Sequence, residues 1–115
     1  MKIKQFEVWI ADLNPQMGTE TGKIRPVVIV QSNLLNAIHP STIICPISTN
    51  IKPGLSLLRI NLAAGVAGLE KDSTILIDQI RAIDNKRLIE KTGVLTEEVS
   101  KALKNCLLNI LDIET

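Results

Sequence analysis

The sequence predicts a mostly β protein: a small, strongly curved, mainly antiparallel sheet or barrel of five or six short strands, followed by one long C-terminal helix. Three observations support this class. Short apolar segments alternate with polar residues at a period of two, Gly, Pro and Asn separate these segments, and sustained helical periodicity occurs only after residue 95. A chain of 115 residues has room for one such domain, spanning residues 1–115.

Two strands and a long loop are expected at the start of the chain. Residues 6–11 alternate at a period of two and predict the first strand. A polar loop over residues 14–23 follows, and the second strand is predicted over residues 27–31. Pro26 disfavours a helical conformation at Arg25, so Arg25 should be extended at the mouth of that strand.

A short helix and a third strand follow. Ser32 can cap one helical turn over residues 33–35, and the strand is expected over residues 42–48. Pro46 has no N–H to donate to a neighbouring strand, so it should mark a sheet edge or a bulge.

The second half contains the remaining strands. We expect a Pro53-Gly54 turn, strands over residues 57–62, 73–83 and 90–94, and a short helix over residues 85–88 capped by Asp84. Alternation within 73–83 places Asp78 on the face of Leu76 and Ile80, which predicts a carboxylate within an apolar strand.

The last segment has the clearest helical pattern. Thr96 can cap a helix, and Glu97 and Glu98 favour its positive end. The apolar stripe consists of Val99, Ala102, Leu103, Cys106, Leu107, Ile110 and Leu111. This stripe should lie across the sheet.

Composition excludes several classes of function. The net charge is +1, but residues 1–59 carry +3 and residues 60–115 carry −2, so an anion-binding site should draw on the first half. Phe6 and Trp9 are the only aromatic residues, which is too few to stack a series of bases. No apolar stretch approaches the roughly 20 residues that cross a bilayer, so we expect a soluble, cytoplasmic protein without membrane contacts.

Nucleotide and metal chemistry are also unexpected. The segment GTETGK at 18–23 has three residues between its glycines, whereas a Walker A motif needs four, and Ile24 replaces the Ser or Thr. His39 has no Cys or carboxylate at ligand spacing, and Cys45 and Cys106, which form no CxxC pair, are expected to be buried free thiols. We therefore expect no metal and no cofactor.

Three polar features remain as candidates for a site: Arg25, the run Ser48 to Asn50, and Asp78-Gln79. Each alone is common in proteins, as a surface ion pair, a polar turn or a structural hydrogen bond. Together they supply a guanidinium, hydroxyls and a carboxylate. This set suits cleavage of RNA, in which the substrate's own 2′-hydroxyl attacks and the protein orients and neutralises.

Short motifs occur in a fixed order along the chain. They are Glu7-Val8-Trp9 with Asp12-Leu13-Asn14-Pro15, then Gly18, Glu20 and Gly22, then Arg25-Pro26-Val27-Val28, then Pro46-Ile47-Ser48-Thr49, and Asp72-Ser73 with Asp78-Gln79-Ile80-Arg81-Ala82-Ile83-Asp84. In order and spacing, over almost the whole chain, they resemble the MazF/PemK/Kid family of toxin endoribonucleases. The resemblance implies an SH3-like barrel, a homodimer, and sequence-selective, metal-independent cleavage of single-stranded RNA to a 2′,3′-cyclic phosphate and a 5′-hydroxyl. It also implies a cognate antitoxin whose disordered tail occupies the RNA groove.

Carried onto this sequence, the resemblance implies that the catalytic residues are Arg25 and Ser48, the latter at a position where the family has Thr. Ser retains the hydroxyl but lacks the methyl group that restricts χ1, so Thr49 could share the role. The expected substrate-binding residues are Glu20, Thr49, Asn50, Asp78 and Gln79, and either Glu20 or Asp78 is expected to orient the attacking hydroxyl. The expected gate over the RNA is the loop that contains Gly18, Thr19, Thr21 and Gly22.

Two other functions compete with this interpretation. A non-catalytic toxin of the same fold could poison DNA gyrase, but the exposed helix face, with Lys101, Lys104, Asn105 and Asn109, has no aromatic anchor for a protein target. An SH3-like peptide-binding module would need a groove lined by aromatic side chains.

Overall fold

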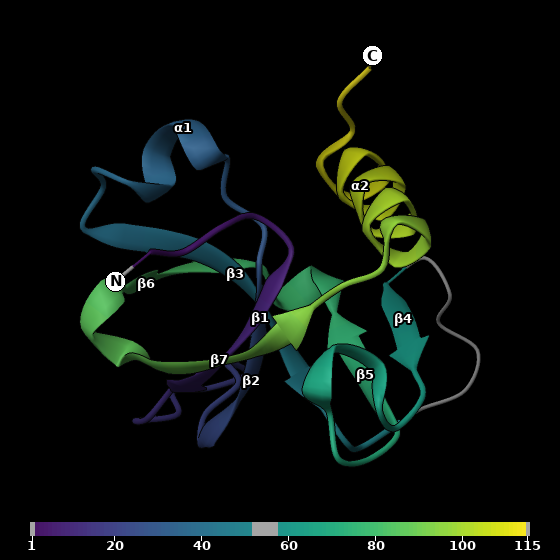
Figure 1. Ribbon diagram of the computed structural model, residues 1–115, viewed down its shortest axis with the longest axis horizontal. Helices are drawn as coiled ribbons and strands as arrows, with labels where there is room; N and C mark the ends of the chain where they lie inside the picture. Colours follow the sequence, from purple (N-terminus) through teal and green to yellow (C-terminus); the bar gives the residue numbers. More distant parts are fainter. Residues whose placement is uncertain (1, 52–57, 115) are drawn as a thin grey trace.

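The computed structural model describes residues 2–51 and 58–114 and shows a curved antiparallel sheet with a long helix beside it (Figure 1). The strands are β1 (Glu7–Asp12), β2 (Ile24–Ile29), β3 (Ser41–Ser48), β4 (Arg59–Leu62), β5 (Ser73–Leu76), β6 (Arg81–Asp84) and β7 (Leu88–Val94). The helical elements are α1 (Asn33–Asn36), α2 (Glu97–Leu111) and three 3-10 turns, η1 (Val66–Gly68), η2 (Ile77–Gln79) and η3 (Asn85–Arg87). The mostly β class is confirmed, whereas the predicted Pro53-Gly54 turn and Leu57 lie outside the described residues.

The sheet is open, so of the predicted sheet or barrel it is the curved sheet that forms, and it does not close into the barrel that the resemblance implies. Its strands follow the order β4-β5-β3-β2-β1-β7, with β6 pairing β3 beside this path. Within the described residues, β4, β6 and β7 each pair with one strand only. Strands β6 and β7 are joined by η3 but enclose apolar side chains, including Ile83 and Leu88, instead of forming a ladder. Packed side chains therefore keep the two ends of the sheet apart.

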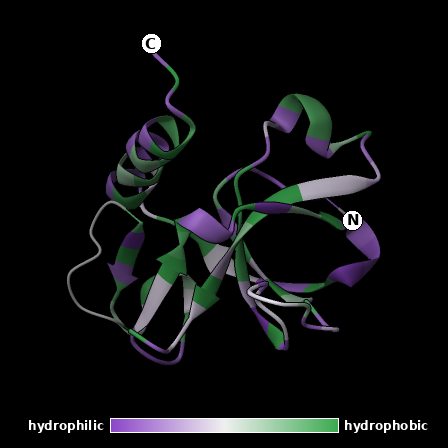
Figure 2. Cartoon of the chain, turned by 180° about the vertical axis from the view of Figure 1, so that it is seen from behind, coloured by the Kyte–Doolittle hydropathy of each residue, from purple (hydrophilic) through white to green (hydrophobic). Residues whose placement is uncertain are grey.

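Two apolar clusters lie on opposite faces of β1 and β2. The cluster on the α2 side contains Val8, Val28, Val30, Cys45, Ile47, Leu62, Leu69, Ile75, Ile77, Leu95 and Leu103. The cluster inside the curve of the sheet contains Ile3, Trp9, Ala11, Leu13, Val27, Ile29, Ile44, Ile83 and Leu88. Neighbouring residues of a strand point to opposite faces, so β1 and β2 supply both clusters. This explains why apolar residues follow one another at 27–30. In Figure 2 the strands at the centre of the molecule carry green, apolar segments.

The helices form where their caps predicted them. The Ser32 hydroxyl accepts a hydrogen bond from the Leu34 N–H, and Asp84 accepts one from Lys86 at η3. Thr96 accepts from Val99 at the start of α2. The stripe of α2 that packs on the sheet is narrower than predicted: Leu103 is fully buried and Val99, Cys106, Leu107 and Ile110 are partly buried, whereas Ala102 and Leu111 are exposed.

The predicted strand over 73–83 is interrupted, which raises the strand number to seven. Strand β5 ends at Leu76, η2 follows, and β6 resumes at Arg81. Strand β3 pairs with β6 through residues 41–44 and with β5 through residues 47–48 on the same side. The 3-10 turn η2 shifts the chain from the β5 ladder to the β6 ladder. This shift is set by pairing with β3, a distant segment, so the period-two alternation within 73–83 does not predict it.

This interruption also corrects the position predicted for Asp78. The residue lies in η2 and is exposed, and its carboxylate forms an ion pair with Arg59. It is therefore not a buried carboxylate within an apolar strand.

Strand β7 extends over Leu88–Val94 despite Gly93, a residue that weakens strands. A Cβ atom at Gly93 would lie 2.5 Å from the backbone carbon of Ala67 in η1. The glycine is therefore needed because η1 crosses β7 at this point.

No helix in the described part of the chain has the length and apolar character needed to span a membrane.

A buried carboxylate ties the N-terminal segment to β7. Glu7 accepts hydrogen bonds from the Lys4 N–H at 2.8 Å and from the Trp9 indole at 3.1 Å, and it forms an ion pair with Lys91 at 2.8 Å. Burial alone raises the pKa of Glu7, but the bonds from Lys91, Trp9 and Lys4 outweigh this effect and lower the pKa overall.

We expect Glu7→Gln to lower the free energy of unfolding by about 1–3 kcal/mol at pH 7, because a buried bond to a charged group is lost. The folded-state pKa lies below the unfolded one, so this contribution is present above about pH 4.3 and fades as the pH falls through the folded-state pKa. Urea unfolding followed by the fluorescence of Trp9 at pH 7 and pH 3 measures both effects. Glu114→Gln, at the exposed C-terminal end, is the control, and an equal loss at the two pH values would contradict the assignment.

Candidate functional site

The candidate site lies where β2 and β3 separate. Their ladder ends at the pair Val27–Pro46. Beyond this pair, β2 stays beside β1 and β3 continues beside β5. The diverging ends leave a pocket of about 390 Å³ between them. This Arg25 pocket is lined by Lys23, Ile24, Arg25 and Pro26 on one side and by Ile47, Ser48, Thr49 and Asn50 on the other.

Pro46 fixes which pairs of this ladder are hydrogen-bonded, and Pro26 removes the next bonded pair. Because Pro46 has no N–H, the pair Val27–Pro46 cannot exchange hydrogen bonds, and the bonded pair must be Val28–Cys45. Because backbone groups alternate in direction along a strand, the nitrogen of Pro26 points toward β3. It has no hydrogen to donate, and the β2–β3 pairing does not continue past this point. Pro46 lies inside the sheet, neither at its edge nor at a recorded bulge, opposite the gap between the β5 and β6 ladders.

Strand β2 begins at Ile24, three residues earlier than predicted, because it pairs with β1 before β3 joins it. Arg25 is thus extended, as expected, but lies inside the strand opposite Ala11. One edge of β2 is open at this position, and this is the side of the Arg25 pocket.

Arg25 is a half-buried cation. Its Nε donates to the carbonyl oxygen of Gly22 at 2.8 Å. Burial lowers the pKa of Arg25, but a guanidinium remains protonated in proteins. The described residues form two ion pairs, Arg59–Asp78 and Lys91–Glu7, and Arg25 belongs to neither. A half-buried cation that lacks an anionic partner is suited to bind an anion from outside.

The opposite wall of the Arg25 pocket carries hydroxyl and amide groups. Ser48 is half-buried at the end of β3, and its Oγ accepts a hydrogen bond from the Asn50 N–H at 3.1 Å. This bond uses the oxygen as acceptor and leaves the hydroxyl proton available for a ligand. Thr49 and Asn50 are exposed beside it. The structure therefore brings together four of the predicted site residues.

The other three residues predicted to be catalytic or to bind substrate do not line the Arg25 pocket. Asp78 and Gln79 lie in η2, where Asp78 pairs with Arg59. Glu20 lies on the exposed part of the β1–β2 loop, and its N–H donates to the Met17 carbonyl at 3.0 Å.

The β1–β2 loop is closed at its base and open at its tip. The Leu13 N–H donates to the Lys23 carbonyl at 2.9 Å, and the Lys23 N–H donates to the Asn14 side chain at 3.0 Å. Two arginines from the far end of the sheet reinforce this base: Arg87 donates to the carbonyls of Asp12 and Asn14, and Arg81 donates to that of Thr21. Together with Arg25, three guanidinium groups therefore contact the loop.

The two glycines of the predicted gate, Gly18 and Gly22, have different surroundings. Gly18 has a φ of +57° with open space around its α-carbon, so it belongs to the tip with Thr19. Gly22 is buried, and a Cβ atom there would lie 2.5 Å from the Cβ of Gln16. Gly22 thus belongs to the packed base beside Thr21, whereas Gly18 lies in the exposed tip over residues 17–19.

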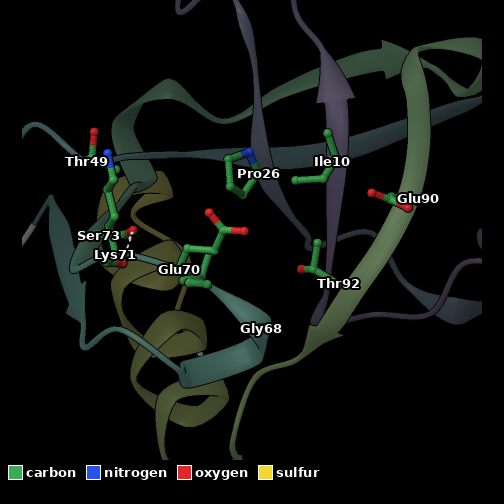
Figure 3. Close-up of a pocket in the computed structure, with 10 residues that line it drawn as sticks. Ile10, Pro26, Thr49, Gly68, Glu70, Lys71, Ser73, Glu90 and Thr92 are labelled. Atoms are coloured by element: carbon green, nitrogen blue, oxygen red, sulfur yellow. Dashed lines mark hydrogen bonds between the residues drawn. The ribbon is translucent and has the colours of Figure 1, made fainter.

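A second hollow, the Glu70 pocket of about 340 Å³, adjoins the first (Figure 3). It is lined by Ile10, Pro26, Thr49, Gly68, Leu69, Glu70, Lys71, Ser73, Glu90 and Thr92. Pro26 and Thr49 line both pockets, so the two form one groove. Of its polar lining, Ser73 and Thr49 belong to motifs noted in the sequence. Glu70, Lys71, Glu90 and Thr92 were not predicted, because they come from separate segments without a recognisable pattern.

No group of three or more potential metal-ligating side chains occurs within residues 2–51 and 58–114.

Cys45 is fully buried, as predicted, and Cys106 is half-buried. Burial, assisted by the charge of Asp78, raises the pKa of the Cys45 thiol to about 12, so this thiol stays protonated and unreactive.

These features define a small β protein with a cleft suited to an anion. A family model of PemK-like, MazF-like toxins of type II toxin-antitoxin systems matches residues 4–111. The chain is 35% identical over 107 residues to endoribonuclease EndoA of Bacillus subtilis, covering 93% of this chain and 92% of the relative. It is 37% identical over 105 residues to endoribonuclease MazF of Staphylococcus epidermidis, covering 91% and 88%.

The fold agrees with a solved MazE–MazF structure from Deinococcus radiodurans, with a TM-score of 0.79, 20% identity and 99% of each chain covered. The chain therefore belongs to the family of PemK-like, MazF-like toxins of type II toxin-antitoxin systems.

Loop anchoring leads to a prediction for hydrogen exchange. We expect the amides of Leu13 and Lys23 to be protected and those of residues 17–19 to exchange rapidly. Arg87→Ala should accelerate exchange at Leu13 and Lys23 about tenfold, because the loss of one or two hydrogen bonds costs about 1–2 kcal/mol. Lys86→Ala, next to Arg87 and exposed, is the control. Unchanged exchange in Arg87→Ala would show that Arg87 does not hold the loop.

Proposed function

We propose that this toxin is a metal-independent endoribonuclease that cuts single-stranded RNA by attack of a 2′-hydroxyl. One observation carries the proposal: the half-buried guanidinium of Arg25 lines the same pocket as the free hydroxyl donor of Ser48. The cation attracts a phosphate and the hydroxyl orients it. The naming of relatives at 35–37% identity as endoribonucleases supports RNA as the substrate.

In the proposed reaction, the 2′-oxygen attacks the adjacent phosphorus and loses its proton. The bond from phosphorus to the 5′-oxygen breaks, and that oxygen takes up a proton. The products are a 2′,3′-cyclic phosphate and a 5′-hydroxyl. Arg25 stabilises the negative charge that develops on the phosphorane, while Ser48, assisted by Thr49, donates to a non-bridging oxygen. Arg25 acts by charge and does not serve as a proton donor, because a guanidinium scarcely deprotonates.

A carboxylate is proposed to orient the attacking hydroxyl. Glu20 is better placed than Asp78, because the loop that carries Glu20 is bonded to Arg25 through Gly22, whereas Asp78 is paired with Arg59. Closure of the loop tip, with Thr19 and Glu20, over the RNA would bring this carboxylate to the pocket. Asp78 and Gln79 are then proposed to contact nucleotides farther from the cut, together with Asn50.

The proposed partners follow from the same groove. Single-stranded RNA fits because the groove joins a pocket with a free cation, suited to a phosphate, to a second pocket that can take an unstacked base. Membership of a toxin-antitoxin family supports a cognate antitoxin, and we propose that its disordered tail occupies the groove in place of RNA. We further propose a single domain over residues 1–115 that acts as a homodimer in the cytoplasm.

The central test uses purified protein and a long RNA in the presence of EDTA. We expect discrete cuts whose new 5′ ends carry hydroxyls. Arg25→Ala should lower the cleavage rate about 10²- to 10³-fold, the usual effect of removing a preorganised charge-stabilising group. Lys101→Ala on the exposed face of α2 is the control. Intact RNA, or cleavage by Arg25→Ala at the normal rate, would refute the assignment.

The hydroxyl pair requires a combined substitution. The double change Ser48→Ala with Thr49→Ala should lower turnover by about 10²-fold, because no hydroxyl donor remains on that wall of the pocket. Ser48→Thr keeps the donor and should retain activity. Single-turnover rates of these variants measure the effect, and unaltered turnover of the double variant would exclude the hydroxyls from the reaction.

A further inference from the structure

The Glu70 pocket is placed to contact the nucleotide next to the cut. It shares Pro26 and Thr49 with the Arg25 pocket, so a chain bound to Arg25 can reach it with the adjacent nucleotide. Its volume of about 340 Å³ accommodates one nucleobase with its sugar. A single-stranded nucleic acid can turn one unstacked base into such a hollow.

The lining of the Glu70 pocket is apolar on one side and acidic on the other. Ile10, Pro26 and Leu69 provide apolar surface. Glu70 projects from the loop after η1 and Glu90 comes from β7 across the pocket (Figure 3). Neither carboxylate has a hydrogen bond or an ion pair among the described residues. Both therefore keep their full capacity to accept hydrogen bonds from a ligand.

We infer that the Glu70 pocket binds an RNA base that carries an exocyclic amino group and rejects uracil. This inference rests on the proposed function and adds a source of sequence selectivity to it. Ionised carboxylates only accept hydrogen bonds. The edges of adenine, cytosine and guanine offer amino donors, whereas uracil offers one N–H flanked by two carbonyl oxygens, which a carboxylate repels.

The charges in the pocket favour a base over a phosphate. Two carboxylates oppose a phosphate there, and the only cation in the lining is Lys71. Figure 3 shows the Lys71 side chain extending toward Thr49, at the junction of the two pockets. Lys71 thus lies where the phosphate between the two nucleotides would pass, while the acidic wall faces the base.

The test compares the wild type with Glu70→Gln and Glu90→Gln on a pool of RNA with randomised sequence. The ends of the products report which bases are accepted beside the cut. We expect the wild type to disfavour uracil at one fixed position next to the cut by about tenfold, the discrimination of one well-placed hydrogen bond. Each variant should reduce this bias several-fold, because an amide can also donate to a uracil carbonyl. Glu97→Gln, outside the pocket, should keep the bias.

A second measurement separates this inference from the proposed function. A randomised pool with 2′-O-methyl groups cannot be cut, and sequencing of the molecules that each protein retains reports base preference from binding alone. Loss of the bias against uracil in both variants, in either assay, supports the pocket assignment even if cleavage fails. Cleavage or binding with the same bias in all four proteins, or with none, would overturn it and leave the ribonuclease proposal standing where RNA is cut.

Discussion

The end of the β2–β3 ladder at Val27–Pro46 is the constraint on which the rest of the site depends. Up to that pair the two strands belong to one sheet and share two apolar clusters. Beyond it, each strand follows a different neighbour, and their polar ends face one another across a pocket. Arg25 and Ser48 therefore lie on strand segments held by the core, which restricts their movement more than a loop would.

The groove keeps its free cation and its free carboxylates in separate pockets. Arg25 has no carboxylate partner among the described residues and contacts a backbone carbonyl, so its charge is oriented but not neutralised. The acidic groups lie one pocket away, where they can select a ligand without competing for the guanidinium. The loop lies beside the first of these groups, because its base is bonded to Arg25 while its tip is exposed.

Local chemistry was predictable from the sequence, whereas pairing between distant segments was not. The caps at Ser32, Asp84 and Thr96 depend on residues two or three positions away, and all three form. The break in 73–83 depends on β3 exchanging one partner for another, and the open sheet depends on side chains packed between β6 and β7. At the site, Arg25 and residues 48–50 were predicted from adjacent motifs, but Glu70 and Glu90 meet only in the folded chain.

Pro26, beside the site, limits how the protein tolerates substitution. The nitrogen of Pro26 faces β3 but carries no hydrogen, so it cannot donate a hydrogen bond to that strand. The β2–β3 ladder therefore cannot extend across the groove and close it. A residue with an N–H at position 26 would permit the two strands to pair for longer. Such a variant would have more strand pairing and a higher free energy of unfolding. It would lose the pocket in which its ligand binds.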